Sequence, residues 1–392
     1  MRAELDIQLR VWTKVLYDFE RGVLMMMRQI FSVLYFVLIS LTVNAADQKK
    51  AGFDYEVVID RDDVIWGLDF LPDGRVLFSE RGGTLSILDP KTKALQKVAN
   101  VPAVANRKQG GLLDVKVHPD FAKNATVFIS YSEPKGDDDT TTSVISATLK
   151  NNSLENIKKI FSAKDIADTG MHFGSRIVFD GKGHVFISVG ERNERDRAQD
   201  LKRHTGKIIR LNEDGSVPAD NPFVGKKDAL PEIWSYGHRN PQGLAYDSEK
   251  ERLWEAEMGP RGGDEVNLVK KGANYGWPVI TYGREYYGPK IGTTHKEGME
   301  QPAVYWVPSI SPSGLALYTG DKFPQWKGNL FLACLSGQEL RRVVVNDAGK
   351  VTHQESLLKD KNTRFRAVRT GLDGNLWVTT DDGVIAKITP SK

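Results

Sequence analysis

The sequence predicts an all-β fold, a six-bladed β-propeller built from four-stranded antiparallel blades. Two observations support this prediction. From about residue 50 onward, one pattern recurs six times: an alternating apolar stretch, a turn rich in Pro, Asp or Gly, and a second β-rich stretch. No long stretch of this region shows helical periodicity. Asp-Gly between alternating apolar runs is a strong hairpin signal, and repeats at this spacing are typical of propellers.

The six copies of the pattern follow one another along the chain. They are Trp66–Glu80, Leu112–Ser132, Ser175–Glu191, Gln242–Gly259, Ser313–Leu335 and Phe365–Asp382. Their uneven spacing indicates long loops, which we expect to collect at one end and build a site. A β-sandwich or two separate β domains is the alternative. No Pro/Ser-rich linker divides the chain, so we expect a single catalytic propeller over residues 47–392.

Residues 1–46 have the pattern of an N-terminal extension followed by a secretory signal peptide. The uncharged run Ile30–Val43 follows the basic residue Arg28 and ends at the small residues Ala45 and Ala46. This run is short for a membrane span, although an uncleaved anchor is the alternative. We therefore expect export to the periplasm, no stable membrane span in the mature protein, and a true start among Met25–Met27.

Composition and motifs exclude several classes of function. The chain has 54 basic and 51 acidic residues, a net charge of +3, so we expect no nucleic-acid partner. The single cysteine, Cys334, excludes an intramolecular disulfide and a CxxC site. There is no HExxH, EF-hand, P-loop or GxSxG motif.

Polar, glycine-rich segments stand out as candidate site loops. They are Lys108–Asp114, Met171–Arg176, Gly190–Asn193, Trp234–Gly243, Glu257–Glu265 and Asn274–Pro278. Taken singly, each has an ordinary structural explanation. His172 could be a hydrogen-bonded histidine at a blade edge, Arg239 a surface charge, and Asp264 a solvated carboxylate.

Taken together and in order, four motifs resemble the soluble PQQ-dependent aldose (glucose/sorbosone) dehydrogenase family, where PQQ is pyrroloquinoline quinone. The motifs are HFGSRIVFDGKG, IWSYGHRNPQG, MGPRGGDEVN with NYGWP, and RFRAVRTGLDG, within a resemblance from about Tyr55 to Ile388. The resemblance implies a six-bladed propeller with a cleft at one end. It also implies oxidation of aldose sugars at C1 to the lactone, with PQQ and Ca²⁺ as cofactors.

The resemblance assigns roles to individual residues. It implies that His172 is the general base, that Glu191 orients it, and that Arg239 stabilises charge on the quinone oxygens. The implied cofactor-binding residues are Gln109, Arg239, Asn240, Gln242, Tyr286, Arg364 and Arg366.

Two calcium sites are implied in the same way. The carbonyls of Gly259 and Pro260 resemble ligands of the calcium that holds PQQ, and Glu265 with the Tyr275 carbonyl resembles a structural site. One residue departs from the family: Ser336 stands where a lysine usually contacts the cofactor. Either a neighbour such as Arg341 replaces that lysine, or PQQ binds more weakly.

Two other classes of function compete with the dehydrogenase. A calcium-dependent propeller lactonase or hydrolase would use a central metal, and a non-enzymatic propeller would bind a protein or glycan. Fold alone does not separate them. We expect a small-molecule aldose substrate and a monomer or homodimer. No feature of the sequence selects the preferred sugar or the electron acceptor.

Overall fold

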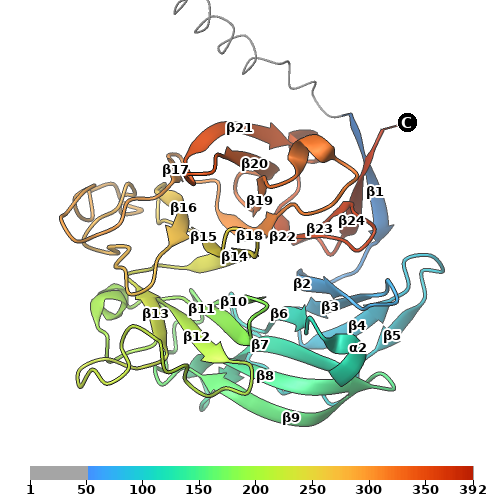
Figure 1. Cartoon of the computed structure of the whole chain (residues 1–392), viewed down its shortest axis with the longest axis horizontal. Helices are drawn as coiled ribbons and strands as arrows, with labels where there is room; N and C mark the ends of the chain where they lie inside the picture. Colours follow the sequence, from blue (N-terminus) through green and yellow to red (C-terminus); the bar gives the residue numbers. More distant parts are fainter. Residues whose placement is uncertain (1–51, 392) are drawn as a thin grey trace, which may run out of the picture. The chain divides into compact units, whose positions relative to one another are not determined.

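The computed structural model describes residues 52–391. The predicted extension and signal peptide, residues 1–46, lie outside the described residues. The described chain forms one compact unit with six four-stranded antiparallel sheets (Figure 1). The predicted six-bladed β-propeller is confirmed. Within residues 52–391, no helix is long and apolar enough to cross a membrane.

The blades follow one another along the chain, each from its inner to its outer strand. Blade one holds β2 (Ile65–Phe70), β3 (Val76–Glu80), β4 (Thr84–Leu88) and β5 (Leu95–Lys97). Blade two holds β6 (Leu112–Val117), β7 (Thr126–Pro134), β8 (Thr140–Lys150) and β9 (Ser153–Ser162). Blade three holds β10 (Gly174–Phe179), β11 (His184–Val189), β12 (Lys207–Asn212) and β13 (Ile233–Tyr236).

The second half of the propeller repeats this order. Blade four holds β14 (Pro241–Asp247), β15 (Arg252–Glu257), β16 (Asp264–Val269) and β17 (Val304–Trp306). Blade five holds β18 (Pro312–Leu317), β19 (Leu330–Cys334), β20 (Glu339–Val345) and β21 (Val351–Leu357). Blade six holds β22 (Phe365–Thr370), β23 (Leu376–Thr380), β24 (Ile385–Pro390) and β1 (Phe53–Ile59). The short helical elements are α2 (Phe121–Asn124), η1 (Arg195–Gln199), η2 (Pro324–Trp326) and η3 (Lys359–Lys361).

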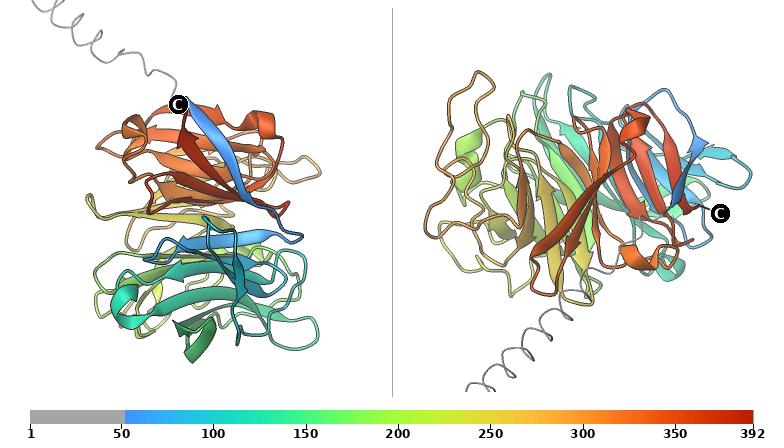
Figure 2. Two further views of the ribbon diagram at one scale, coloured as in Figure 1. Left: turned by 90° about the vertical axis from the view of Figure 1, so that its right-hand side faces the viewer. Right: turned by 90° about the horizontal axis from the view of Figure 1, so that it is seen from above.

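Blade six closes the ring, because its outer strand comes from the start of the described chain. β1 pairs antiparallel with β24, with Glu56 opposite Lys387 in the register and in an ion pair with it. The two ends of the described chain therefore lie side by side (Figures 1 and 2). This pairing gives the last blade its fourth strand and leaves no unpaired edge on β24.

Apolar side chains fill the spaces between neighbouring blades. One cluster joins Phe128 and Val144 of blade two to Ile177 and Val185 of blade three. Cys334 lies in the equivalent cluster of blades four and five, wholly buried. Each sheet thus covers both of its faces with its neighbours, which is why the repeat is stable only as a ring.

The axis of the propeller is filled by a buried ionic network. Arg176 of β10 donates to Asp114 of β6 at 2.8 Å and to the carbonyls of Gln242 and Ser313 at 2.8 and 2.9 Å. Arg369 of β22 also pairs with Asp114, at 3.3 Å. Each of these side chains comes from a different inner strand, so the network ties the ring together at its centre.

Candidate active site

Antiparallel topology explains why the predicted residues gather at one end of the propeller. In every blade the inner strand begins, and the second strand ends, at the same end of the sheet. Gln109, His172, Arg239, Asn240 and Arg364 lie just before inner strands. Glu191, Gly259, Pro260 and Ser336 lie just after second strands.

An irregular register marks the site end of all six blades. The pairing of inner and second strands shifts at the start of each inner strand, within Ile65–Gly67, Leu112–Val115, Gly174–Ile177, Pro241–Gly243, Pro312–Gly314 and Phe365–Ala367. Such bulges bend a strand and re-aim its side chains. Here they turn the residues that enter each inner strand toward the end of the axis.

His172 is held by hydrogen bonds on both its ring and its backbone. Its Nδ1 lies 2.6 Å from Glu191 Oε1, and its backbone N–H donates to Gln109 Oε1 at 2.9 Å. The side chain is buried, with the residue 3% exposed, and its φ is 51°. A β-carbon-bearing residue at positive φ is uncommon and marks a backbone that its surroundings constrain.

Gly190 allows the His172 backbone to approach the blade. A Cβ at Gly190 would lie 2.1 Å from the His172 carbonyl oxygen, a distance that no side chain tolerates. Glu191 follows directly, so the same close approach brings its carboxylate to the imidazole. Its backbone N–H donates to the Arg239 carbonyl at 2.8 Å, which links blade three to the loop entering blade four.

The electrostatic surroundings keep the imidazole neutral. Burial lowers the pKa of His172 most strongly, the hydrogen bond to Glu191 raises it in part, and the charge of Arg239 lowers it again. Because Nδ1 faces a carboxylate, the ring proton belongs there. Nε2, which has no hydrogen-bond partner among residues 52–391, is left as a proton acceptor.

Arg239 carries a charge that the described protein does not neutralise. Its guanidinium donates to the carbonyls of Met258 and Gly259 at 2.9 and 3.0 Å. No carboxylate of residues 52–391 forms an ion pair with it, although its backbone N–H donates to Glu257 at 2.6 Å. Trp277 lies beside the guanidinium, 5.4 Å from ring centroid to Cζ. A fixed, unpaired guanidinium is suited to bind an anionic group.

Asn240 and Gln242 are both buried but differ in their partners. Asn240 Oδ1 accepts the Gly174 N–H at 3.2 Å, so it ties the loop that carries His172 to blade four. Gln242 Oε1 accepts from Ser313 at 3.1 Å and from Arg366 at 3.2 Å. The structure therefore places Gln242 in the axial network, with its amide nitrogen left for a ligand.

Arg364 and Arg366 share one carboxylate. Both guanidinium groups pair with Asp381 at 2.8 Å. Burial raises the pKa of Asp381, but the two arginines lower it overall, so this carboxyl is ionised. Two cations facing one anion leave a net positive charge for a ligand. Asp381 was not among the predicted site residues, although it follows a second strand as Glu191 does.

Tyr286 lies at the wall of a cavity of about 710 Å³ together with Pro260 and Ser336. Arg261 and Arg284 line the same cavity, and the Arg261 guanidinium donates to the Tyr286 carbonyl at 3.4 Å. Arg341, one of the two alternatives named for the missing family lysine, pairs with Glu339 at 2.5 Å and does not line this cavity.

Asp264 shapes the loop of the predicted cofactor calcium. The expectation that it could be solvated is wrong, because it is wholly buried. Its carboxylate accepts the Gly259 N–H at 2.8 Å and the N–H groups of Ile310 and Ser311 at 2.6 and 2.7 Å. It thus fixes the Gly259–Pro260 turn, whose backbone carbonyls suit a hard cation. The Gly259 carbonyl also accepts the hydrogen bond from the Arg239 guanidinium.

Glu265 and Tyr275, the predicted structural calcium residues, lie in a buried acidic region of blade four. Burial and the charge of Glu257 raise the pKa of Glu265 well above its ordinary value. Its Oε2 accepts from Asn267 at 3.3 Å, and no Lys or Arg of the described chain pairs with it. A buried carboxylate without a cationic partner fits a metal ligand.

Arg192 is a further positioning residue that sequence reasoning did not assign. Its guanidinium lies over the Phe173 ring at 3.8 Å and donates to the carbonyls of Met171 and Thr140 at 2.8 and 3.1 Å. It therefore clamps the residues on either side of His172. The only feature of the sequence that pointed to a role for Arg192 was its position directly after Glu191.

Residues 62–387 match the glucose/sorbosone dehydrogenase family. The chain is 42% identical to aldose sugar dehydrogenase YliI of Escherichia coli, over 93% of this chain and all of that protein. It is 26% identical to quinoprotein glucose dehydrogenase B of Acinetobacter calcoaceticus, over 86% of this chain and 87% of that one.

Solved structures agree with these sequence relatives. The apo form of the soluble E. coli aldose sugar dehydrogenase superposes with a TM-score of 0.83 at 43% identity, covering 86% of this chain and all of that one. The PQQ-bound aldose sugar dehydrogenase of Streptomyces coelicolor superposes with a TM-score of 0.73 at 28% identity, covering 87% and 99%. The chain therefore belongs to the glucose/sorbosone dehydrogenase family of sugar-oxidising oxidoreductases.

Proposed function

We propose that the chain oxidises aldose sugars at C1 to the lactone, with PQQ and Ca²⁺ as cofactors. One observation carries the proposal: the buried His172–Glu191 pair lies next to the unpaired guanidinium of Arg239. A proton acceptor beside a fixed positive charge suits a reaction that removes a proton and a hydride from one carbon. The PQQ-bound relative supports the choice of cofactor.

His172 takes the proton of the C1 hydroxyl on Nε2 in this proposal. Glu191 accepts the Nδ1 hydrogen at 2.6 Å, which fixes the tautomer and stabilises the imidazolium as it forms. When bound, PQQ supplies the acceptor for the hydride that leaves C1. Arg239 would stabilise the negative charge that develops on the acceptor, and its guanidinium would not have to move to do so.

The remaining predicted residues position the cofactor. Arg364 and Arg366, which share Asp381, present the net positive charge that carboxylate groups of PQQ require. Tyr286 lines the cavity that also includes Pro260, where it would border the cofactor. The Gly259 and Pro260 carbonyls would hold a calcium ion, which supplies Lewis-acid polarisation when bound.

Reconstitution of the full chain tests this function. The apoprotein is expected to be inactive, and PQQ with Ca²⁺ is expected to restore aldose-dependent reduction of a dye. Sugar oxidation with NAD and no PQQ would contradict the proposal. Hydrolysis of a lactone without PQQ would favour the calcium-dependent lactonase, and specific binding without turnover would favour the non-enzymatic propeller.

We further propose that residues 1–46 direct the protein to the periplasm and are then removed. The apolar run before Ala45 and Ala46 supports this. Cell fractionation with N-terminal sequencing of the exported protein tests it. An intact N-terminus on membrane-bound protein would indicate an anchor instead.

A further inference from the structure

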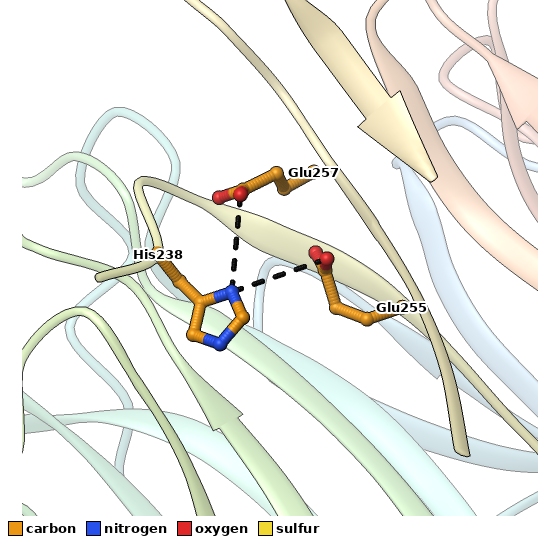
Figure 3. A group of neighbouring side chains, drawn as sticks. All are labelled: His238, Glu255 and Glu257. Atoms are coloured by element: carbon orange, nitrogen blue, oxygen red, sulfur yellow. Dashed lines mark ion pairs between the residues drawn. The ribbon is translucent and has the colours of Figure 1, made fainter. Parts of the chain in front are cut away.

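Blade four holds a histidine and two glutamates that converge inside the protein. His238 lies in the loop between β13 and β14, and Glu255 and Glu257 lie two residues apart on β15 (Figure 3). Successive side chains of a strand alternate between faces, so residues two apart point the same way. The three side chains are buried, and His238 and Glu255 have no exposed surface.

Both distances from the His238 ring nitrogen to the glutamates are short enough for ligands of one ion. His238 Nδ1 lies 3.8 Å from Glu257 Oε1 and 4.0 Å from Glu255 Oε2, and all candidate ligand atoms lie within 4.8 Å of one another. Two atoms that each lie about 2.1 Å from one metal can be up to about 4.2 Å apart. The same separations are too long for direct hydrogen bonds.

Several buried polar atoms of these side chains and of their neighbour Asn267 have no hydrogen-bond partner among residues 52–391. His238 Nδ1, Glu255 Oε1 and Asn267 Oδ1 are buried and accept or donate no hydrogen bond among residues 52–391. The other ring nitrogen of His238, Nε2, lies 2.9 Å from Ser235 Oγ, which orients the imidazole with Nδ1 toward the carboxylates. A second hydrogen bond of this kind is usual for metal-binding histidines.

The charge of the group also calls for a cation. In the described chain, no Lys or Arg forms an ion pair with Glu255 or Glu257; His238 is their only basic neighbour at that distance. Glu265 lies close by, because the Asn267 amide donates to both Glu255 at 3.0 Å and Glu265 at 3.3 Å. Uncompensated buried carboxylates are strongly destabilising.

We propose that His238, Glu255 and Glu257 bind a divalent transition-metal ion, with Zn²⁺ as the representative. A ring nitrogen among the ligands favours such an ion over Ca²⁺, which takes oxygen ligands. The site is separate in its ligands from the calcium predicted at Glu265 and Tyr275, and it does not depend on the proposed oxidation. We assign the ion a structural role. Glu257 Oε2 also accepts the backbone N–H of Arg239, so a metal that holds Glu257 would also fix the loop that carries Arg239.

Metal titration of the full chain tests the site. After dialysis against a chelator, Zn²⁺ alone is added and followed by calorimetry and melting temperature. We expect one tight site per chain in the wild type, and at least about a tenfold loss of affinity in Glu255→Gln and His238→Gln. Glu339→Gln is the matched control: Glu339 is a buried glutamate of blade five that pairs with Arg341, and its substitution should leave Zn²⁺ binding unchanged.

A spectroscopic measurement on the wild type does not depend on the variants folding. With Cu²⁺ as the probe, nitrogen hyperfine coupling from one imidazole is expected in the electron paramagnetic resonance spectrum. Three results would overturn the proposal: no stoichiometric Zn²⁺ binding, Zn²⁺ binding unaffected by both ligand substitutions, or a Cu²⁺ site without nitrogen coupling. Binding of Ca²⁺ but not Zn²⁺ that depends on Glu255 would overturn the transition-metal assignment.

Discussion

Arginines occupy two regions of this propeller, the axis and the candidate active site, and they differ in how their charge is balanced. On the axis, Arg176 has no exposed surface and pairs with Asp114 at 2.8 Å. At the site, Arg239 donates only to backbone carbonyls and has no carboxylate partner in the described chain. On the axis Arg176 and Arg369 share the carboxylate of Asp114, whereas the guanidinium of Arg239 has no carboxylate partner among residues 52–391 and is left for a ligand.

This difference separates residues that stabilise the ring from residues that act on a ligand. Burial lowers the pKa of Arg176 to about 10 although the charge of Asp114 raises it, so Arg176 remains charged at neutral pH. Substitutions on the axis should therefore change folding stability. Substitutions at the site should change turnover or ligand binding and leave stability nearly unchanged.

The largest expected effect is on turnover in His172→Ala. A positioned general base contributes about 10²–10⁴-fold to a rate, so kcat should fall by that factor with a modest change in KM. His184→Ala is the matched control: its Nδ1 also pairs with a carboxylate, Asp180, at 2.7 Å, but at the other end of blade three. Near wild-type kcat in His172→Ala would remove this residue from the mechanism.

On the axis, Arg176→Met should lower the free energy of unfolding by about 3–5 kcal/mol, because it leaves a buried charge with one fewer partner. Chemical denaturation measures this. Arg75→Met removes a surface pair with Asp73 and should change stability by less than about 1 kcal/mol. Equal effects of the two substitutions would show that the axial network is not a stabilising element.

If Arg239 acts on a ligand and not on the fold, Arg239→Met should lower activity and leave stability nearly unchanged, unlike Arg176→Met. Loss of one group that stabilises developing charge lowers kcat by about 10²–10³-fold. PQQ affinity, followed by absorbance, should also fall, while the melting temperature of the apoprotein stays close to that of the wild type. A large loss of apoprotein stability would place Arg239 with the axial arginines.

Glu265→Gln tests the predicted structural calcium. A metal bound only by the folded state stabilises it by about 2.7 kcal/mol at a hundred times its Kd. The wild type should therefore melt at a higher temperature in calcium than in chelator, and the variant should lose that difference. An unchanged calcium response in the variant would rule out this role for Glu265.

The smallest effect is a shift of the pH profile in Glu191→Gln. The neutral form of His172 is the base, so activity falls as pH drops through its pKa. The Glu191 carboxylate raises that pKa against the effect of burial. Removing its charge should move the acid limb of kcat/KM to lower pH and reduce kcat. A shift to higher pH would contradict the assigned role of Glu191 as the carboxylate that stabilises the imidazolium.

Much of the fold was predictable from short-range pattern. The alternation of apolar residues around turns such as Asp73-Gly74 and Asp373-Gly374 locates hairpins, and six repeats of it predicted six blades. Motif order also located His172, Glu191, Arg239 and Asn240 on loops at one end. Hairpins depend on neighbouring residues, so one sequence suffices to predict them.

By itself the sequence determined the strand order, the blade number and the set of loops that meet at the site. The tertiary structure alone decided which charges find partners there. Asp381 pairs with Arg364 and Arg366, Asp114 with Arg176 and Arg369, and Asp264 with the Gly259 turn, whereas Arg239 has no carboxylate partner within residues 52–391. These pairings join residues far apart in the chain. Their energy depends on distance and burial, which only the closed ring of blades defines.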